Sequence, residues 1–112
     1  MSKKTPEGIV QDEIIDYVKY LEDYGYPIWY ERRQAGGFNY KKGAPDLFVV
    51  YNGIHIEVEV KQQNGERRPL QEKWEKRCKN KYKCEYICVY SFLEFKKYIN
   101  LLIYELSDKT KF

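Results

Sequence analysis

The fold is decided by residues 43–61, which read GAPDLFVVYNGIHIEVEVK. Asn52-Gly53 lies between two apolar runs. This dipeptide favours a two-residue type I′ turn, because both central residues of that turn need a positive φ. The stretch therefore predicts a β-hairpin with strands over residues 46–51 and 54–61.

The register of this hairpin brings two acidic residues together. If Asn52-Gly53 is the turn, Tyr51 faces Ile54, and counting outward places Asp46 directly opposite Glu59. Opposed side chains of an antiparallel pair have Cβ atoms roughly 4.5–5.5 Å apart. Two carboxylates this close repel each other unless a cation lies between them, so the register predicts a metal ion.

The second strand alternates between apolar and polar residues with a period of two. Its apolar residues must face the core, so Glu59 and Lys61 point together toward a cleft or solvent. Carboxylates suit Mg²⁺, a hard cation that prefers oxygen ligands. Such an ion activates a bound water and neutralises charge on a phosphate, and a nearby lysine stabilises the transition state. This chemistry favours phosphodiester hydrolysis.

These residues also carry a family resemblance. Pro45-Asp46 followed by Glu59-x-Lys61 resembles the PD-(D/E)XK nuclease superfamily. A wider set of motifs is similar to the virus-type replication-repair nuclease (VRR-NUC) group within it. These motifs are Thr5-Pro6-Glu7-Gly8, Gly43-x-Pro45-Asp46, Ile56-Glu57-Val58-Glu59-Val60-Lys61 and Gln71. The resemblance spans about residues 5 to 90.

One departure from the family pattern is a doubled acid before Lys61. Both the hairpin register and the Glu-x-Lys spacing select Glu59, because Glu57 lies opposite Phe48 and farther from Asp46.

The resemblance implies roles for individual residues. Asp46 and Glu59 would ligate Mg²⁺, or Mn²⁺ in its place, and Lys61 would position the nucleophile. Glu7, near the middle of the buried face of the first helix, would help to hold the metal, or else serves only as a capping acid. Gln71 would support catalysis, although its place in a first helical turn is also typical of a capping residue. We expect the backbone carbonyl of Val60 to complete the metal site.

Basic residues form two clusters around the acidic pair. One precedes the Pro-Asp motif and the other runs from Arg67 to Lys83. Either alone could be a solvated face, but two clusters that bracket an acidic pocket predict contact with a phosphate backbone. The residues expected to contact DNA are Arg32, Arg33, Lys41, Lys42, Arg67, Arg68 and Lys73.

Patterns outside the hairpin complete the predicted fold. They indicate a Thr5-capped helix to about Asp23, a strand over 28–33, a helix from Pro69, a strand over 85–90 and a final helix after Ser91. Because the last strand is reached through a helix, it should run parallel to the hairpin strand 54–61. The expected fold is α/β: an αβββαβ restriction-endonuclease-like core, with a small mixed sheet flanked by helices and an extra C-terminal helix.

The second and final helices carry predicted packing surfaces. The second should pack along one edge made by Leu70, Trp74, Arg77 and Cys78. The final helix has a long apolar stripe, which either packs on the sheet or forms part of a dimer interface. The stripe contains Phe92, Phe95, Ile99, Leu102, Ile103 and Leu106.

Composition limits the alternatives. The 112 residues suit one domain, 1–112, and their apolar content of 43% suits a folded globule. No apolar run is long enough for a membrane span, and no signal-peptide pattern opens the chain. Three cysteines, an odd number with no zinc spacing, favour reduced thiols in the cytoplasm of a bacterial or phage-infected cell.

The sequence therefore predicts a Mg²⁺-dependent endonuclease that needs no small-molecule cofactor. With no added recognition module, it should recognise DNA shape. The resemblance implies branched DNA, such as four-way (Holliday) junctions, cut by a homodimer in phage replication, repair or recombination. Two alternatives remain: a monomeric flap or nicking nuclease of the same fold, and a non-catalytic nucleic-acid-binding module.

Overall fold

The computed structural model of the chain describes residues 5–33 and 43–109. Their regular elements follow the predicted order with boundaries shifted by about one residue. They are α1 (Pro6–Asp23), β1 (Ile28–Arg32), β2 (Leu47–Tyr51), β3 (Ile54–Val60), α2 (Pro69–Arg77), a π-helical segment (Cys78–Tyr82), β4 (Glu85–Val89) and α3 (Phe92–Lys109). None of the described helices is long and apolar enough to cross a membrane.

The predicted hairpin register is confirmed. Tyr51 pairs with Ile54 and Leu47 pairs with Val58. The turn residues Asn52 and Gly53 have φ angles of 50° and 83°, as a type I′ turn requires. One further step of this register would place Asp46, just before β2, opposite Glu59.

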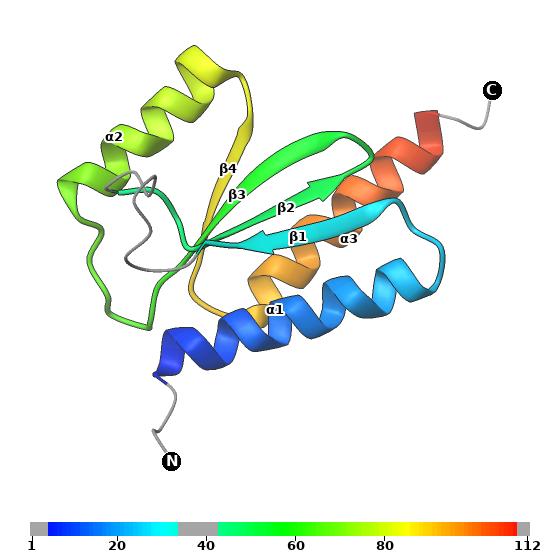
Figure 1. Cartoon of the computed structure of the whole chain (residues 1–112), viewed down its shortest axis with the longest axis horizontal. Coiled ribbons are helices and arrows are strands. Elements are labelled where there is room, and N and C mark those ends of the chain that lie inside the picture. Colours follow the sequence, from blue (N-terminus) through cyan, green and yellow to red (C-terminus); the bar gives the residue numbers. More distant parts are fainter. Residues whose placement is uncertain (1–4, 34–42, 110–112) are drawn as a thin grey trace.

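The described strands form one mixed sheet in the order β1-β2-β3-β4. The first three strands are antiparallel neighbours, whereas β4 runs parallel to β3 after the crossover through α2. Figure 1 shows α1 and α3 together on one side of the sheet and α2 on the other. The predicted αβββαβ fold with a mixed sheet flanked by helices is confirmed.

The larger core lies between the sheet and the pair α1 and α3. Fully buried residues come from every layer, for example Ile14 of α1, Leu47 of β2, Ile56 of β3 and Phe95 of α3. The apolar stripe of α3 packs into this core or against its border, so the packing interpretation of that stripe is confirmed.

The opposite face of the sheet is also covered, which corrects the expectation that it opens to a cleft or solvent. A smaller cluster of Trp74, Cys78 and Tyr86 lies beneath α2 and the π-helical segment. Glu57 and Glu59 belong to this face, and they are only 2% and 3% exposed. The two acids of β3 are therefore buried side chains and need partners inside the protein.

The second helix packs along a shorter edge than predicted. Trp74 and Cys78 are buried, but Leu70 and Arg77 are exposed. The prediction was wrong for those two residues because the π-helical segment, which follows α2 without a break, makes the contact with β4, and α2 itself buries Trp74.

Candidate active site

Four residues singled out by their motifs line one cavity. Glu7, Asp46, Lys61 and Gln71 border a pocket of about 440 Å³. They come from the first turn of α1, the residue before β2, the residue after β3 and the first turn of α2. Gly43, Ala44, Arg68 and Leu70 complete the described lining.

The fold fixes each of these positions through backbone contacts. The Thr5 hydroxyl accepts a hydrogen bond from the Gly8 amide at 3.0 Å and caps α1, so that Glu7 stands in its first turn. Glu7 Oε2 in turn accepts a hydrogen bond from the Gln62 amide at 3.4 Å, which joins the start of α1 to the end of β3. Lys61 is held by β4, since its backbone amide donates a hydrogen bond to the Val89 carbonyl at 2.9 Å.

The glycine of the Gly43-x-Pro45-Asp46 motif has a steric role at this pocket. Gly43 has a φ of 86°, and a Cβ built on it would lie 2.5 Å from the Leu70 carbonyl oxygen. No larger residue can occupy that space without moving the backbone of α2. Gly43 therefore lets the loop that carries Asp46 approach the start of the helix that carries Gln71.

Gln71 both borders the pocket and caps a helix. Its Oε1 accepts a hydrogen bond from the Arg68 amide at 2.8 Å, as in the reciprocal half of a capping box. Pro69 occupies the first helical position, where its missing N–H costs nothing. The capping interpretation is thus correct for the side-chain oxygen, and the catalytic role of Gln71 stays a prediction.

Glu59 lies beside this group but does not line the pocket. Its Oε1 accepts a hydrogen bond from the Tyr86 hydroxyl at 2.6 Å, while Cys88 Sγ lies 3.9 Å from its Oε2. Arg67 Nε lies 3.6 Å from the same Oε2. Within residues 5–33 and 43–109, no three acidic, histidine or cysteine side chains are grouped so that they could hold a metal ion. Of the predicted ligands, Glu7 and Asp46 share a cavity and Glu59 is bonded beneath α2.

Glu57 has a different set of partners. Arg33 forms a two-pronged ion pair with it, at 2.6 Å between Nη1 and Oε1 and 2.8 Å between Nη2 and Oε2. His55 Nε2 also contacts Glu57 Oε2. Arg33 Nη1 donates a further hydrogen bond to the Pro45 carbonyl at 2.6 Å. The predicted phosphate contact Arg33 is therefore engaged inside the fold.

The other predicted DNA contacts fall into four groups. Arg68 and Lys73 are exposed, and Arg68 borders the pocket. Arg32 forms an exposed ion pair with Asp12 at 3.0 Å. Arg67 is largely turned inward, where it pairs with Glu75 at 2.7 Å. Lys41 and Lys42 lie outside the described residues.

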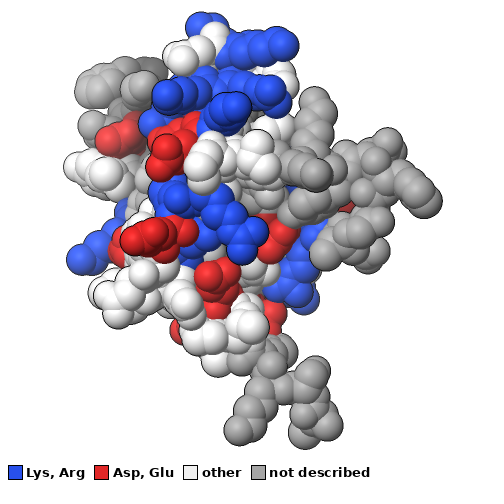
Figure 2. Space-filling view, turned by 90° about the vertical axis from the view of Figure 1, so that its left-hand side faces the viewer, with Lys and Arg blue, Asp and Glu red and all other residues white. Residues whose placement is uncertain are grey.

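Charge is unevenly spread over the face of the molecule near the pocket. Figure 2 shows Lys and Arg side chains gathered in its upper part, at the height of α2, with further basic groups beside acidic ones toward the middle. Such a surface suits the binding of a polyanion.

Sequence reasoning missed the partners of Glu59. Tyr86 and Cys88 reach it from β4, where Cys88 is its direct neighbour in the parallel ladder. Burial, followed by the hydrogen bond with Glu59, raises the pKa of Tyr86 far above its ordinary value, so this hydroxyl keeps its proton and remains a donor. The available signal was the pattern of β4, in which Tyr86 and Cys88 are two residues apart and so face the same side of the sheet as Glu59.

Comparison with known proteins adds one finding. No family model and no curated protein sequence matches the chain. A solved structure described as a VRR_NUC domain superposes on it with a TM-score of 0.67 and 28% sequence identity, over 87% of this chain and 97% of the other. With the motifs gathered around one pocket, this shared fold and sequence support the identification of the chain as a VRR-NUC domain, the nuclease type that its sequence resembles.

Proposed function

We propose that this domain is a metal-dependent DNA endonuclease whose active site is the pocket bordered by Glu7, Asp46, Lys61 and Gln71. The observation that carries the proposal is the convergence of these four side chains on one cavity, although they come from four separate parts of the chain. Each was selected by its motif, and structural packing alone does not explain two acids and a lysine at one opening.

The donor groups of the pocket fit Mg²⁺ or Mn²⁺. Glu7 and Asp46 supply carboxylate oxygens within one cavity. In proteins Mg²⁺ is commonly held by one or two carboxylates, together with substrate phosphates and several waters. Glu7, Asp46 and Glu59 would hold the ion, with the Val60 carbonyl as an additional ligand. When bound, such an ion lowers the pKa of a coordinated water and neutralises charge on the scissile phosphate.

The residues of the chain have separate tasks in the hydrolysis. A water oxygen forms a bond to phosphorus, one P–O bond to a sugar oxygen breaks, and the departing oxygen takes up a proton as the water loses one to solvent. Lys61 orients the water and stabilises the added negative charge on the phosphate. Gln71, fixed through its oxygen at the start of α2, supports Lys61 or a phosphate oxygen through its amide nitrogen.

The substrate we propose is DNA, and branched DNA such as a four-way junction in particular. Arg68, at the pocket, and Lys73, in the middle of α2, would contact phosphates, with Arg32 on the far side of Asp46. The resemblance to VRR-NUC proteins supports a homodimer, which would present one site to each of two strands in replication, repair or recombination. Leu93, Leu101 and Tyr104 are exposed on α3 and offer apolar surface for such an interface.

A panel of substrates tests this function. Four-way junction, flap and linear duplex DNA are incubated with Mg²⁺, with Mn²⁺ and with chelator, while light scattering gives the mass of the protein. We expect junction cleavage that depends on the metal and falls by roughly 10²–10³-fold in Lys61→Ala, as when one electrostatic stabiliser is removed. Asp46→Asn should also lose cleavage. Lys97→Ala, which removes an exposed lysine of α3, serves as the matched control and should cleave normally.

Three results would change the proposal. Tight junction binding without cleavage in either metal would make the domain a non-catalytic binding module. Preferred cleavage of flaps by a protein of monomer mass would favour a flap nuclease. Full activity in Lys61→Ala would remove the pocket as the active site.

A further inference from the structure

The carboxylate of Glu59 is enclosed more tightly than a solvent-facing ligand requires. Glu59 and Tyr86 are only 3% and 6% exposed, and the hydrogen bond between them is 2.6 Å long. Tyr86 stands on β4 two residues before Cys88, the ladder partner of Glu59, and is itself paired with Glu57. The bond therefore runs diagonally across the two parallel strands.

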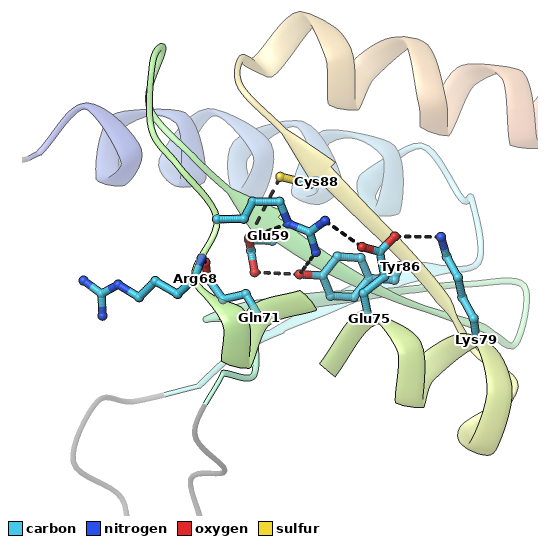
Figure 3. Close-up of polar contacts among 8 residues, drawn as sticks. Glu59, Arg68, Gln71, Glu75, Lys79, Tyr86 and Cys88 are labelled. Carbon is cyan, nitrogen blue, oxygen red and sulfur yellow. Dashed lines mark hydrogen bonds and ion pairs between the residues drawn. The ribbon is translucent and has the colours of Figure 1, made fainter. Parts of the chain in front are cut away.

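Arg67 completes the enclosure from the loop before α2. Its Nε faces Glu59 Oε2 at 3.6 Å, and its Nη2 donates to the Tyr86 hydroxyl oxygen at 3.3 Å. Its Nη1 pairs with Glu75 at 2.7 Å, and Glu75 in turn pairs with Lys79 at 2.6 Å. Figure 3 shows this row of contacts running from Glu59 along α2. The guanidinium group is thus directed at protein partners on several sides.

This arrangement restricts how the Glu59 side chain can turn. A carboxylate has two oxygens with about four acceptor positions, so a donor on each oxygen leaves further lone pairs for another ligand. Tyr86 is fixed by β4, and Arg67 is fixed by its ion pair with Glu75 of α2. Together they select one orientation of the Glu59 carboxylate. Carboxylates that bind metals are commonly hydrogen-bonded in this way by residues that do not touch the metal.

We propose that Tyr86 and Arg67 are positioning residues that orient the Glu59 carboxylate for metal binding. This inference rests on the proposed function, in which Glu59 is a ligand. It also separates two adjacent arginines of the basic run. Arg67 acts within the protein on Glu59, whereas Arg68, exposed at the pocket, contacts DNA.

The test is Mn²⁺ binding to the full chain in the absence of DNA, measured by isothermal titration calorimetry. Tyr86→Phe removes only the hydroxyl and should weaken Mn²⁺ binding roughly 10–100-fold, the usual effect of losing such a supporting group. Tyr17→Phe is the matched control, because it removes a hydroxyl that donates to Asn100 at 2.7 Å on the opposite side of the sheet. It should bind Mn²⁺ like the wild type. Cleavage by Tyr86→Phe should recover at high Mn²⁺ concentration, with unchanged affinity for DNA.

The two arginines give a second comparison, which stays informative if Tyr86→Phe fails to fold. Arg67→Lys keeps the charge but loses the fork that reaches Glu59, Glu75 and Tyr86 together. It should weaken Mn²⁺ binding and leave DNA affinity unchanged. Arg68→Ala should do the reverse, and it should lower the salt dependence of DNA binding by about one charge.

The outcomes distinguish this inference from the proposed function. If Glu59→Gln weakens Mn²⁺ binding but Tyr86→Phe and Arg67→Lys bind like the wild type, the positioning role is wrong and the nuclease proposal stands. If Glu59→Gln binds Mn²⁺ normally, Glu59 is no ligand and the inference falls. If the wild type neither binds Mn²⁺ nor cleaves DNA, both proposals fall together. If Arg67→Lys weakens DNA binding but not Mn²⁺ binding, Arg67 is a phosphate contact and not a positioning residue.

Discussion

Replacement of Arg33 by alanine should destabilise the fold far more than the same change at Arg32. Arg33 is the two-pronged partner of Glu57, which is only 2% exposed, and it also donates to the Pro45 carbonyl. Its removal leaves a buried carboxylate that still contacts His55 on the same strand. Arg32 pairs with Asp12 on the surface, where water replaces the lost partner.

The burial of the two pairs sets the expected magnitudes. Breaking a buried ion pair by removing one partner costs about 3–5 kcal/mol, because the other charge is left unpaired in the low-dielectric protein interior. The side chain of Arg33 is 23% exposed, so some water reaches the pair, and we expect a loss of about 3 kcal/mol. For Arg32→Ala, whose pair has side chains 42% and 33% exposed, we expect about 0–1 kcal/mol. A total stability of about 5–15 kcal/mol makes the first loss easy to measure.

Urea unfolding followed by tryptophan fluorescence and by circular dichroism measures both variants. The midpoint should fall strongly for Arg33→Ala at an unchanged slope, which would show that stability has changed and not the extent of unfolding. A paired Arg33→Met, Glu57→Leu variant should regain most of the loss, because neither charge is then buried alone. Equal stability of Arg33→Ala and Arg32→Ala would refute the reasoning, since it would mean that Glu57 does not depend on its partner.

Three further predictions test other parts of the structure. Gly43→Ala should lower stability by more than about 1 kcal/mol and reduce cleavage, as measured by thermal unfolding and a junction assay, because the new Cβ meets the Leu70 carbonyl. The Cys78 thiol should react with a thiol reagent at pH 8 only after unfolding. Burial, followed by a hydrogen bond with Cys84, raises the pKa of this thiol to about 12, so it stays protonated and enclosed in the folded protein. Burial, followed by nearby acids, raises the pKa of Tyr98 to about 12. As the pH rises above about 10, the unfolded chain therefore loses the Tyr98 proton before the folded chain does, and the free energy of unfolding falls toward pH 12. Tyr98→Phe should make this fall less steep, as measured by urea unfolding at a series of pH values.

The hairpin was predictable because its signals are local. Asn52-Gly53 determines the turn, the turn determines the register, and the register pairs Leu47 with Val58 as counted from the sequence. The pocket was predictable in part for the same reason, because Asp46 and Lys61 lie at the ends of the paired strands. Glu7 and Gln71 were found through helix signals and the family motifs together.

The environment of the acids could not be read from the sequence. Alternation along β3 shows which residues share a face, but not that α2 covers that face. The partners of Glu59 depend on the parallel register of β3 with β4, which a long connection through α2 does not specify. Counting charges likewise could not separate Arg67 from Arg68, because only the folded loop turns one inward and the other outward.

The unequal cores on the two sides of the sheet determine the order in which parts of the molecule come apart. α1 and α3 bury the larger apolar cluster, whereas α2 is fastened by Trp74, Cys78 and Tyr86 together with polar contacts. Elements with little buried apolar surface open locally at lower free energy than the whole domain, and their amide hydrogens exchange sooner. α2 should therefore detach first and carry Gln71 and the Arg67 contacts with it. The chain would then lose the proposed active site while most of its sheet is still folded.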